Sequence, residues 1–284
     1  MTEGPVLPYV TAADVAARLD MVGAVAALEA ALRAGLDPED DPPRDSVALD
    51  GGGELLVMPS AAGGHPAVKL VTVGGRPRIQ GVCVVFDRRT LAPVAVVDGI
   101  ALTTLRTAAT SALAVKHLAA AEPRRLVVFG RGPQAHAHVA ALRAVRPSID
   151  HVDMVGREGA VDVAGADVIC CCTTARTPLF DGARVADHAT VVAVGAHDPA
   201  ARETDDALAA RATVVVESRS SALREAGDVV GAIAAGALSA EALVPLAEVV
   251  RGTATIDRAR PRLFKSTGMA WEDAVVAAAL TGLG

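Results

Sequence analysis

The chain has 284 residues, a net charge of −6 and only 2% aromatic residues, while 51% of its residues are hydrophobic. This length allows one large domain or two ordinary ones. An acidic balance without a basic run argues against nucleic acid as a partner, and the scarcity of aromatic residues argues against a protein that stacks sugars or bases. The chain lacks an apolar stretch of about 18 residues and a signal-peptide pattern, so we expect a cytoplasmic protein without membrane contact.

The first third of the chain is predicted to form two short helices and then a sheet. Thr11 and Asp14 form a capping-box-like start for the first helix, and Asp20 can cap the second. Short β-branched runs separated by Gly, Pro and Asp follow, which indicates an antiparallel or mixed sheet. These runs span 55–59, 67–73, 82–87 and 93–98, and a helix over about 102–120 comes after them.

From Leu126 onward, apolar runs alternate with helical patterns, which predicts a parallel sheet covered by helices. The expected strands include 126–129, 151–155, 166–173, 190–195 and 213–218. The last stretch, 262–280, is interpreted as an amphipathic helix with its lead-in. We expect this helix to pack back onto the first part of the chain.

A glycine turn lies where the first of these strands gives way to a helix. Gly130, Gly132 and Ala135 fit the pattern G-x-G-x-x-A. The first glycine permits a tight turn, the second lets the backbone approach a pyrophosphate, and the small third residue lets the helix pack on the strand. Pro133 suits the first helical position, and the helix N-terminus would face the phosphates. The pattern predicts a dinucleotide loop, with a purely structural turn as the alternative.

The tip of the next strand favours NADP over NAD. An acid for the NAD ribose is usual there, but this strand ends in Gly156 and Arg157, and Asp153 lies inside it. An arginine suits a 2′-phosphate, although it would also be ordinary on a solvated surface. NAD therefore stays possible. About ten residues separate Arg157 from the following strand, too few for a full helix.

The cysteines and histidines are not expected to hold a metal. Adjacent strand residues point to opposite faces, so the run Cys170–Cys172 makes a poor disulfide set or metal site. These residues and Cys83 are interpreted as small buried hydrophobes. His136 and His138 are two apart and do not share a helix face. We therefore predict no metal.

Several stretches, in order along nearly the whole chain, resemble the ornithine cyclodeaminase/mu-crystallin family. They include "VKLVT" at 68–72, "LTTLRTAATSALA" at 102–114, "GRGPQA" at 130–135, "ADVICCCTT" at 166–174 and "RLFKSTGMAWEDAV" at 262–275. The resemblance implies a homodimer with a bound nicotinamide cofactor and an α-amino or α-imino acid substrate. It also implies an α/β fold in which a Rossmann-type parallel-sheet domain (116–255) is inserted into a smaller α+β substrate-binding and dimerisation domain (1–115 plus 256–284).

The resemblance places substrate-binding residues at Arg44, Met58, Lys69 and Arg106, of which the three cations would hold the substrate carboxylate. Lys69 lies inside an apolar strand and Arg106 in a helix segment with little other charge, so both need a reason to be there. A snorkelling lysine or a buried structural salt bridge is the alternative.

Cofactor-binding residues are also implied by the resemblance or by their place at strand ends. They are Thr107, Gly130, Gly132, Pro133, Gln134, Arg157, Thr173, Thr174, Val194, Gly195 and, more weakly, Ser266.

Two departures from the family pattern favour reduction over cyclodeamination. Where cyclodeaminases carry acids, this chain has Leu56 and His197, and leucine cannot exchange a proton. A reductase needs a hydride donor, an anchored carboxylate and a protonated C=N bond, with Lys69 or His197 as the catalytic proton donor.

We therefore expect an NAD(P)H-dependent reductase of a cyclic or secondary imino acid, such as pyrroline-2-carboxylate or piperideine-2-carboxylate. An ornithine or lysine cyclodeaminase or an amino-acid dehydrogenase is one alternative. An NADPH-dependent ligand-binding protein, as mu-crystallin suggests, is another.

Overall fold

The computed structural model describes residues 6–157 and 159–283, which divide into two compact units. The first unit comprises residues 1–106 with 269–284, and the second comprises residues 107–268. The second unit is thus inserted into the first, and the α/β fold class expected from the sequence is confirmed. The division at 115/116 and 255/256 stays a prediction.

The first unit is built on a six-stranded mixed sheet in the order β1-β6-β5-β4-β3-β2, in which only β1 and β6 run parallel. Its strands are β1 (Tyr9–Val10), β2 (Asp45–Ala48), β3 (Glu54–Ser60), β4 (Ala67–Val73), β5 (Ile79–Phe86) and β6 (Pro93–Asp98). Its helices are α1 (Ala12–Arg18), α2 (Met21–Arg33) and α9 (Ala270–Thr281), and α3 (Gly99–Leu118) begins in it.

Both predicted helix starts are confirmed. The Thr11 hydroxyl accepts from the Asp14 backbone N–H while the Asp14 carboxylate accepts from the Thr11 N–H, which completes the capping box of α1. The Asp20 carboxylate accepts from the Gly23 N–H at 2.7 Å and caps α2.

A helix is present at the end of the chain, as predicted, but it is not amphipathic. Its lead-in is a strand, β13 (Arg262–Lys265), which lies in the middle of the second unit's sheet, between β10 and β11. The helix itself, α9, is buried almost all round, because it packs against both α2 and the sheet strands β3, β4 and β5. A helix covered on several sides needs no polar stripe. Its expected packing onto the first unit is confirmed.

The second unit is a seven-stranded parallel sheet in the order β12-β11-β13-β10-β9-β7-β8. Its strands are β7 (Arg125–Phe129), β8 (His151–Val155), β9 (Val168–Cys171), β10 (Thr190–Ala193), β11 (Thr213–Val216), β12 (Val244–Pro245) and β13. Its helices are α4 (Pro133–Val145), α5 (Asp206–Arg211), α6 (Arg219–Glu225), α7 (Gly227–Ala234) and α8 (Leu246–Arg251), with the later part of α3.

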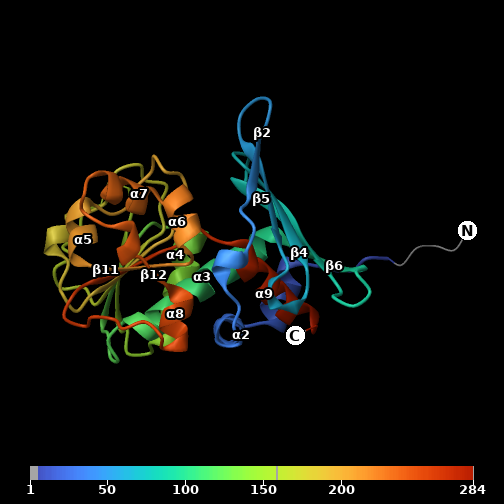
Figure 1. Ribbon diagram of the computed structural model, residues 1–284, viewed down its shortest axis with the longest axis horizontal. Coiled ribbons are helices and arrows are strands. Elements are labelled where there is room, and N and C mark those ends of the chain that lie inside the picture. Colours follow the sequence, from blue (N-terminus) through green and yellow to red (C-terminus); the bar gives the residue numbers. More distant parts are fainter. Residues whose placement is uncertain (1–5, 158, 284) are drawn as a thin grey trace, which may run out of the picture. The chain divides into compact units, whose positions relative to one another are not determined.

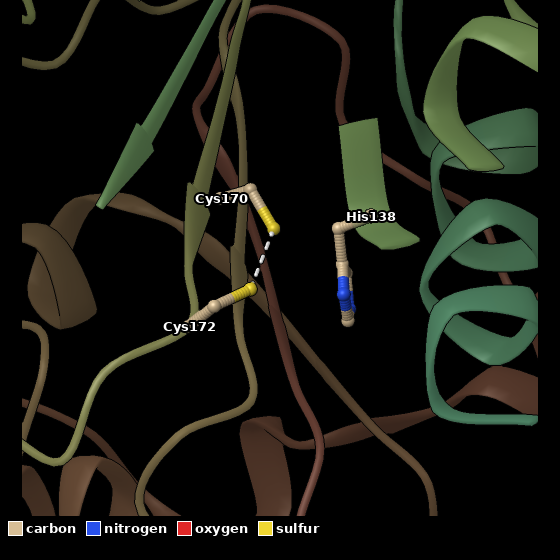
Figure 2. Close-up of side chains that lie close together, drawn as sticks. All are labelled: His138, Cys170 and Cys172. Carbon is tan, nitrogen blue, oxygen red and sulfur yellow. Dashed lines mark hydrogen bonds between the residues drawn. The ribbon is translucent and has the colours of Figure 1, made fainter. Parts of the chain in front are cut away.

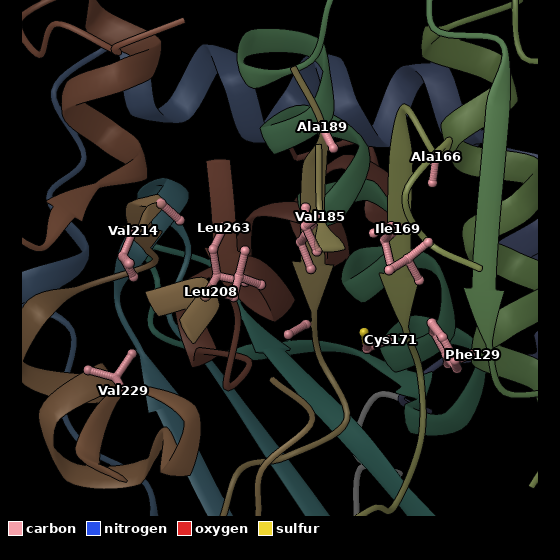
Figure 3. Packing of buried hydrophobic residues seen from close by; sticks show 14 of the residues in the cluster. Phe129, Ala166, Ile169, Cys171, Val185, Ala189, Leu208, Val214, Val229 and Leu263 are labelled. Atoms are coloured by element: carbon pink, nitrogen blue, oxygen red, sulfur yellow. The ribbon is translucent and has the colours of Figure 1, made fainter. Parts of the chain in front are cut away.

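Alternate residues of these strands enter two different apolar layers. One layer joins Phe129, Ile169, Cys171 and Leu263 to apolar side chains of α5, α6 and α7, which gather on that side of the sheet (Figures 1 and 3). The other face, which carries Cys170, is covered in part by α4, which packs on β7 and β9. Between β8 and β9 the described residues form no helix, as the short spacing predicted.

No helix within residues 6–157 and 159–283 is both long and apolar enough to cross a membrane.

Candidate functional site

The predicted glycine turn lies between β7 and α4 and borders a cleft of about 820 Å³ in the second unit. Residues from three segments line the cleft, and several of the expected cofactor positions are among them. The lining includes Gly130, Arg131, Gly132, Gly156, Arg157, Cys172, Thr173 and Thr174. The structure therefore brings the glycine turn, the tip of β8 and the end of β9 together around one space.

The two glycines of the turn are needed for different reasons. Gly130 has φ +119°, and a Cβ there would lie 2.6 Å from the Cys172 carbonyl oxygen, so the fold itself requires glycine. Gly132 has φ −82°, and a Cβ there would meet no atom of the chain within 4 Å. Gly132 leaves room beside the cleft rather than relieving a clash inside the chain. Such room at a helix N-terminus fits the phosphates of a dinucleotide.

Other expected cofactor positions lie close to this turn in sequence or structure. Pro133 is the first residue of α4, Gln134 follows it in the first turn, and Ala135 is fully buried against the sheet. Thr107 lies in α3 and is half-buried. Their contacts with a cofactor stay predictions.

A buried carboxylate, Glu203, joins the ends of β9 and β10. It accepts from the Thr173 N–H and hydroxyl, both at 2.8 Å, and from the Gly195 N–H at 2.7 Å. A Cβ on Gly195 would lie 1.9 Å from the Thr173 carbonyl oxygen, so these two expected cofactor positions pack directly together. Burial raises the pKa of Glu203 to about 7, although Lys265 and the Thr173 donors oppose that shift.

A buried ion pair, Lys265 with Asp228, lies close to Glu203. The Lys265 ammonium is 3.1 Å from an Asp228 oxygen and donates to the Ala196 carbonyl at 2.6 Å. Val194 and His197, which flank Gly195 and Ala196 in the chain, are both half-buried. Ser266, the weakest expected cofactor residue, donates to Glu217 at 2.6 Å, and Glu217 also accepts from the Gly268 N–H.

In the first unit, Lys69 and Arg106 form a buried ion cluster with two acids of α9. The Lys69 ammonium lies 2.6 Å from an Asp273 oxygen. Arg106 reaches the second Asp273 oxygen at 3.1 Å and Glu272 at 2.5 Å. The four side chains are at most 6% exposed, and their formal charges cancel. Two of the three expected carboxylate-binding cations are therefore together.

Burial is the main influence on the Lys69 ammonium. It lowers the pKa of Lys69 to about 8, with help from the Arg106 guanidinium and against the effect of Asp273. A lysine with this pKa exchanges a proton far more readily near neutrality than an ordinary lysine does.

The apolar neighbours of Lys69 match the sequence interpretation. Met58 is its register partner on β3, and Leu56, Met58 and Ala270 pack in one buried cluster. Leu56 is buried, with 6% of its surface exposed, and its hydrocarbon side chain has no proton to exchange. Arg44 is half-buried directly before β2, and its role in holding a substrate stays a prediction.

The cysteine run behaves differently from the sequence interpretation. Adjacent residues do point to opposite faces, but Cys170 and Cys172 are two apart and share a face, where their sulfurs lie 3.6 Å apart beside His138 of α4 (Figure 2). A hydrogen bond from Cys170, together with His138, lowers the pKa of Cys172 to about 5. Cys171 points away into the apolar layer.

The acids that hold these cations and loops were not predicted from the sequence. Glu272 and Asp273 stand in an otherwise apolar helix, a signal of the same kind that singled out Lys69. Glu217 lies at the end of the predicted strand 213–218, which places it at the carboxyl edge of the sheet, whereas Glu203 and Asp228 lie in mixed segments where nothing in the sequence distinguishes them from surface acids.

Comparison with known proteins supplies a further set of findings. The model of the "Ornithine cyclodeaminase/mu-crystallin family" matches residues 9–161 and 155–281. A Delta(1)-pyrroline-2-carboxylate/Delta(1)-piperideine-2-carboxylate reductase of Azospirillum brasilense is 33% identical over 302 aligned positions, which cover 96% of this chain and 94% of that protein. A ketimine reductase mu-crystallin of Macropus fuliginosus is 34% identical and covers 79% of each chain. The solved structure of an archaeal alanine dehydrogenase dimer with bound NAD superposes with a TM-score of 0.88 at 25% identity, over 97% of this chain and 95% of that one.

Proposed function

Because the chain belongs to the ornithine cyclodeaminase/mu-crystallin family, we propose that it is an NAD(P)H-dependent reductase that converts a cyclic or secondary imino acid to the amino acid. The observation that carries this proposal is that Lys69 and Arg106 lie together in one buried ion cluster, while the neighbouring strand β3 carries Leu56 where cyclodeaminases carry an acid. The relatives named as pyrroline-2-carboxylate, piperideine-2-carboxylate and ketimine reductases support the substrate class.

The proposed chemistry needs little from the protein beyond placement and one proton. A nicotinamide cofactor supplies a hydride when bound. Lys69 and Arg106, with Arg44, would hold the substrate carboxylate by charge-assisted hydrogen bonds. Lys69, whose pKa of about 8 leaves it mostly protonated at neutral pH, would keep the imine nitrogen protonated so that its carbon accepts a hydride. His197 is the alternative proton donor.

The experiment that tests this function offers purified protein a panel of cyclic ketimines and mixtures of keto acids with amines. Loss of the near-ultraviolet absorbance of NADPH and NADH is recorded. Oxidation with pyrroline-2-carboxylate or piperideine-2-carboxylate is the expected result. If the fluorescence of NADPH changes on binding but no imine is reduced, the protein is a ligand-binding protein and not a reductase. Release of ammonia from ornithine or lysine without added reduced cofactor identifies a cyclodeaminase.

We further propose that NADP(H) is preferred over NAD(H). The support is the pair Arg131 and Arg157, which both line the cleft beside Gly156. Replacement of Arg157 by Ser removes one cation that would pair with the 2′-phosphate. We expect the KM for NADPH to rise by about tenfold, the size of one charge-assisted contact, while the KM for NADH stays within twofold. Equal changes in both values would contradict the preference.

We also propose that the protein acts as a homodimer in the cytoplasm. The related archaeal dehydrogenase is a dimer, and the four cysteines of this chain are free thiols, as is usual in a reducing compartment.

A further inference from the structure

A cluster of three soft ligands lies behind the glycine turn and takes no part in the proposed reduction. An imidazole nitrogen of His138 and the sulfurs of Cys170 and Cys172 all lie within 4.8 Å of one another. His138 and Cys170 are fully buried, and Cys172 borders the cleft. We propose that these three residues bind a thiophilic divalent cation, with Zn²⁺ as the best-matched ion.

The spacing of the sulfurs fits such an ion. Two thiolates at about 2.3 Å from a tetrahedral zinc ion stand about 3.8 Å apart. The two sulfurs in this structure are 3.6 Å apart, so they need almost no movement to bind one ion. Cys170 and Cys172 gain this spacing because Cys170 lies in β9 and Cys172 directly follows the last residue of that strand, so the two are alternate residues of the chain.

The histidine is oriented as a metal ligand requires. Its Nδ1 lies 2.8 Å from the Gln134 carbonyl oxygen, which can only accept, so Nδ1 carries the proton. The lone pair of the neutral ring is then on Nε2. A backbone carbonyl on the far nitrogen is the usual outer partner of a zinc-bound histidine, and it fixes both the tautomer and the ring plane.

Charge favours a divalent ion over a monovalent one. Two thiolates and a neutral imidazole around a divalent cation have no net charge, and a neutral complex avoids the high cost of an isolated buried charge. The Ser111 hydroxyl hydrogen-bonds His138 Nε2 at 2.9 Å, and an ion bound to Nε2 would replace that hydrogen bond. The site would tie α4 to the end of β9 close to the glycine turn, where a Cβ on Gly130 would lie 2.6 Å from the Cys172 carbonyl oxygen.

The proposal is independent of the reductase function and is tested without turnover. The full-length protein is freed of metal with a chelator, kept reduced, and titrated with Co²⁺. One Co²⁺ per chain should bind, with strong thiolate-to-cobalt absorption in the near ultraviolet, and one equivalent of Zn²⁺ should abolish that absorption. A folded wild-type protein without this absorption would overturn the proposal.

Variants separate this site from the other thiols. The pair Cys170→Ser and Cys172→Ser should remove the absorption, whereas Cys171→Ser should keep it, because Cys171 faces the opposite layer. His138→Gln should weaken Co²⁺ binding at least about tenfold, the loss that even an outer partner causes. Absorption that persists in the double serine variant would overturn the assignment.

A second readout covers the case in which the double variant does not fold. Bound Zn²⁺ should raise the Tm of the wild-type and Cys171→Ser proteins and should shield Cys170 and Cys172 from alkylation, as read by peptide mass. Unchanged alkylation with Zn²⁺ present contradicts the proposal. If the reduced protein takes up no metal but peroxide joins Cys170 to Cys172, with loss of two hydrogens as water, the cluster is a redox pair and not a metal site.

Discussion

At the scale of single residues, one substitution in the buried Lys69–Asp273 pair changes both activity and stability. Lys69→Met should abolish imine reduction, but it also leaves the Asp273 carboxylate without its 2.6 Å partner. We expect the free energy of unfolding to fall by about 3 kcal/mol, the usual cost of an uncompensated buried charge. Urea unfolding measures this loss, and the absorbance of NADPH measures the activity.

A matched double variant separates stability from function. Lys69→Met with Asp273→Asn removes one charge of each sign and leaves Arg106 paired with Glu272. We expect most of the stability to return while activity stays absent. Recovery of both would mean that Lys69 only balances Asp273 and does not act on substrate.

The lowered pKa of Lys69 also sets a pH dependence. With a pKa of about 8 in the folded protein, kcat/KM should fall as the pH rises above 8, because the neutral amine neither holds a carboxylate nor protonates an imine. Between pH 8 and the ordinary value of 10.5, the unfolded chain binds the additional proton, so this group makes stability rise with pH. The loss of activity therefore cannot come from unfolding caused by Lys69.

Lys69→Arg provides the control for that profile. Arginine stays charged throughout this range, so the variant, even if slower, should lose the alkaline decline near pH 8. A decline that persists unchanged assigns the titration to another group or to the substrate imine.

At the scale of elements, the turn between β7 and α4 gives two glycine substitutions with opposite expected results. Gly130→Ala should destabilise the fold by about 1–3 kcal/mol, because its φ of +119° is strained for alanine and its Cβ would meet the Cys172 carbonyl. Gly132→Ala should change stability by less than about 0.5 kcal/mol yet weaken NADPH binding at least about tenfold, because its Cβ projects into space that a phosphate needs. Thermal unfolding and NADPH fluorescence measure the two effects.

The contrast between the two glycines is itself the control. Equal losses of stability would mean that the turn is only structural. Normal NADPH affinity in a folded Gly132→Ala protein would remove the phosphates from this helix terminus.

Elements with a local signal could be predicted, and elements fixed by distant partners could not. The capping box at Thr11 and the strand–turn–helix around Gly130 are local patterns, and the structure has both. The strand β13 begins and ends with the cations Arg262 and Lys265, so its short apolar centre resembles a loop in sequence. It becomes a central strand because it pairs with β10 on one side and β11 on the other, and because both cations find buried hydrogen-bond partners there.

The same reason explains the missed contacts of the candidate site. Lys69 and Arg106 were identifiable because a charge in an apolar segment is unusual, but their partners come from a helix more than 160 residues away from Arg106. The cluster of His138 with Cys170 and Cys172 could not be predicted from adjacent cysteines, which point to opposite faces, because it is formed by cysteines two apart, which share a face, and by a histidine from a separate helix.

At the scale of the whole molecule, the sheet of the first unit has one covered and one uncovered face. The covered face, next to α9, holds buried residues such as Leu56, Lys69 and Cys83. The opposite face is also apolar, and its members are half-exposed and paired across neighbouring strands. They include Val57, Val68, Leu70, Val82, Val84 and Val96. A contiguous apolar sheet face of this kind marks an association surface.

The homodimer that we propose should use this face, so charges placed on it should separate the subunits. The wild-type protein is expected to sediment as two chains of 28.7 kDa each. Leu70→Asp with Val84→Asp puts two like charges in the middle of the face, where a symmetric contact would bring four together without water. We expect sedimentation as a single chain, with little loss of monomer stability because both side chains are only half-buried. Val22→Asp, at a 57% exposed position on α2, should leave the dimer intact. A double variant that still sediments as two chains would move the interface to another surface.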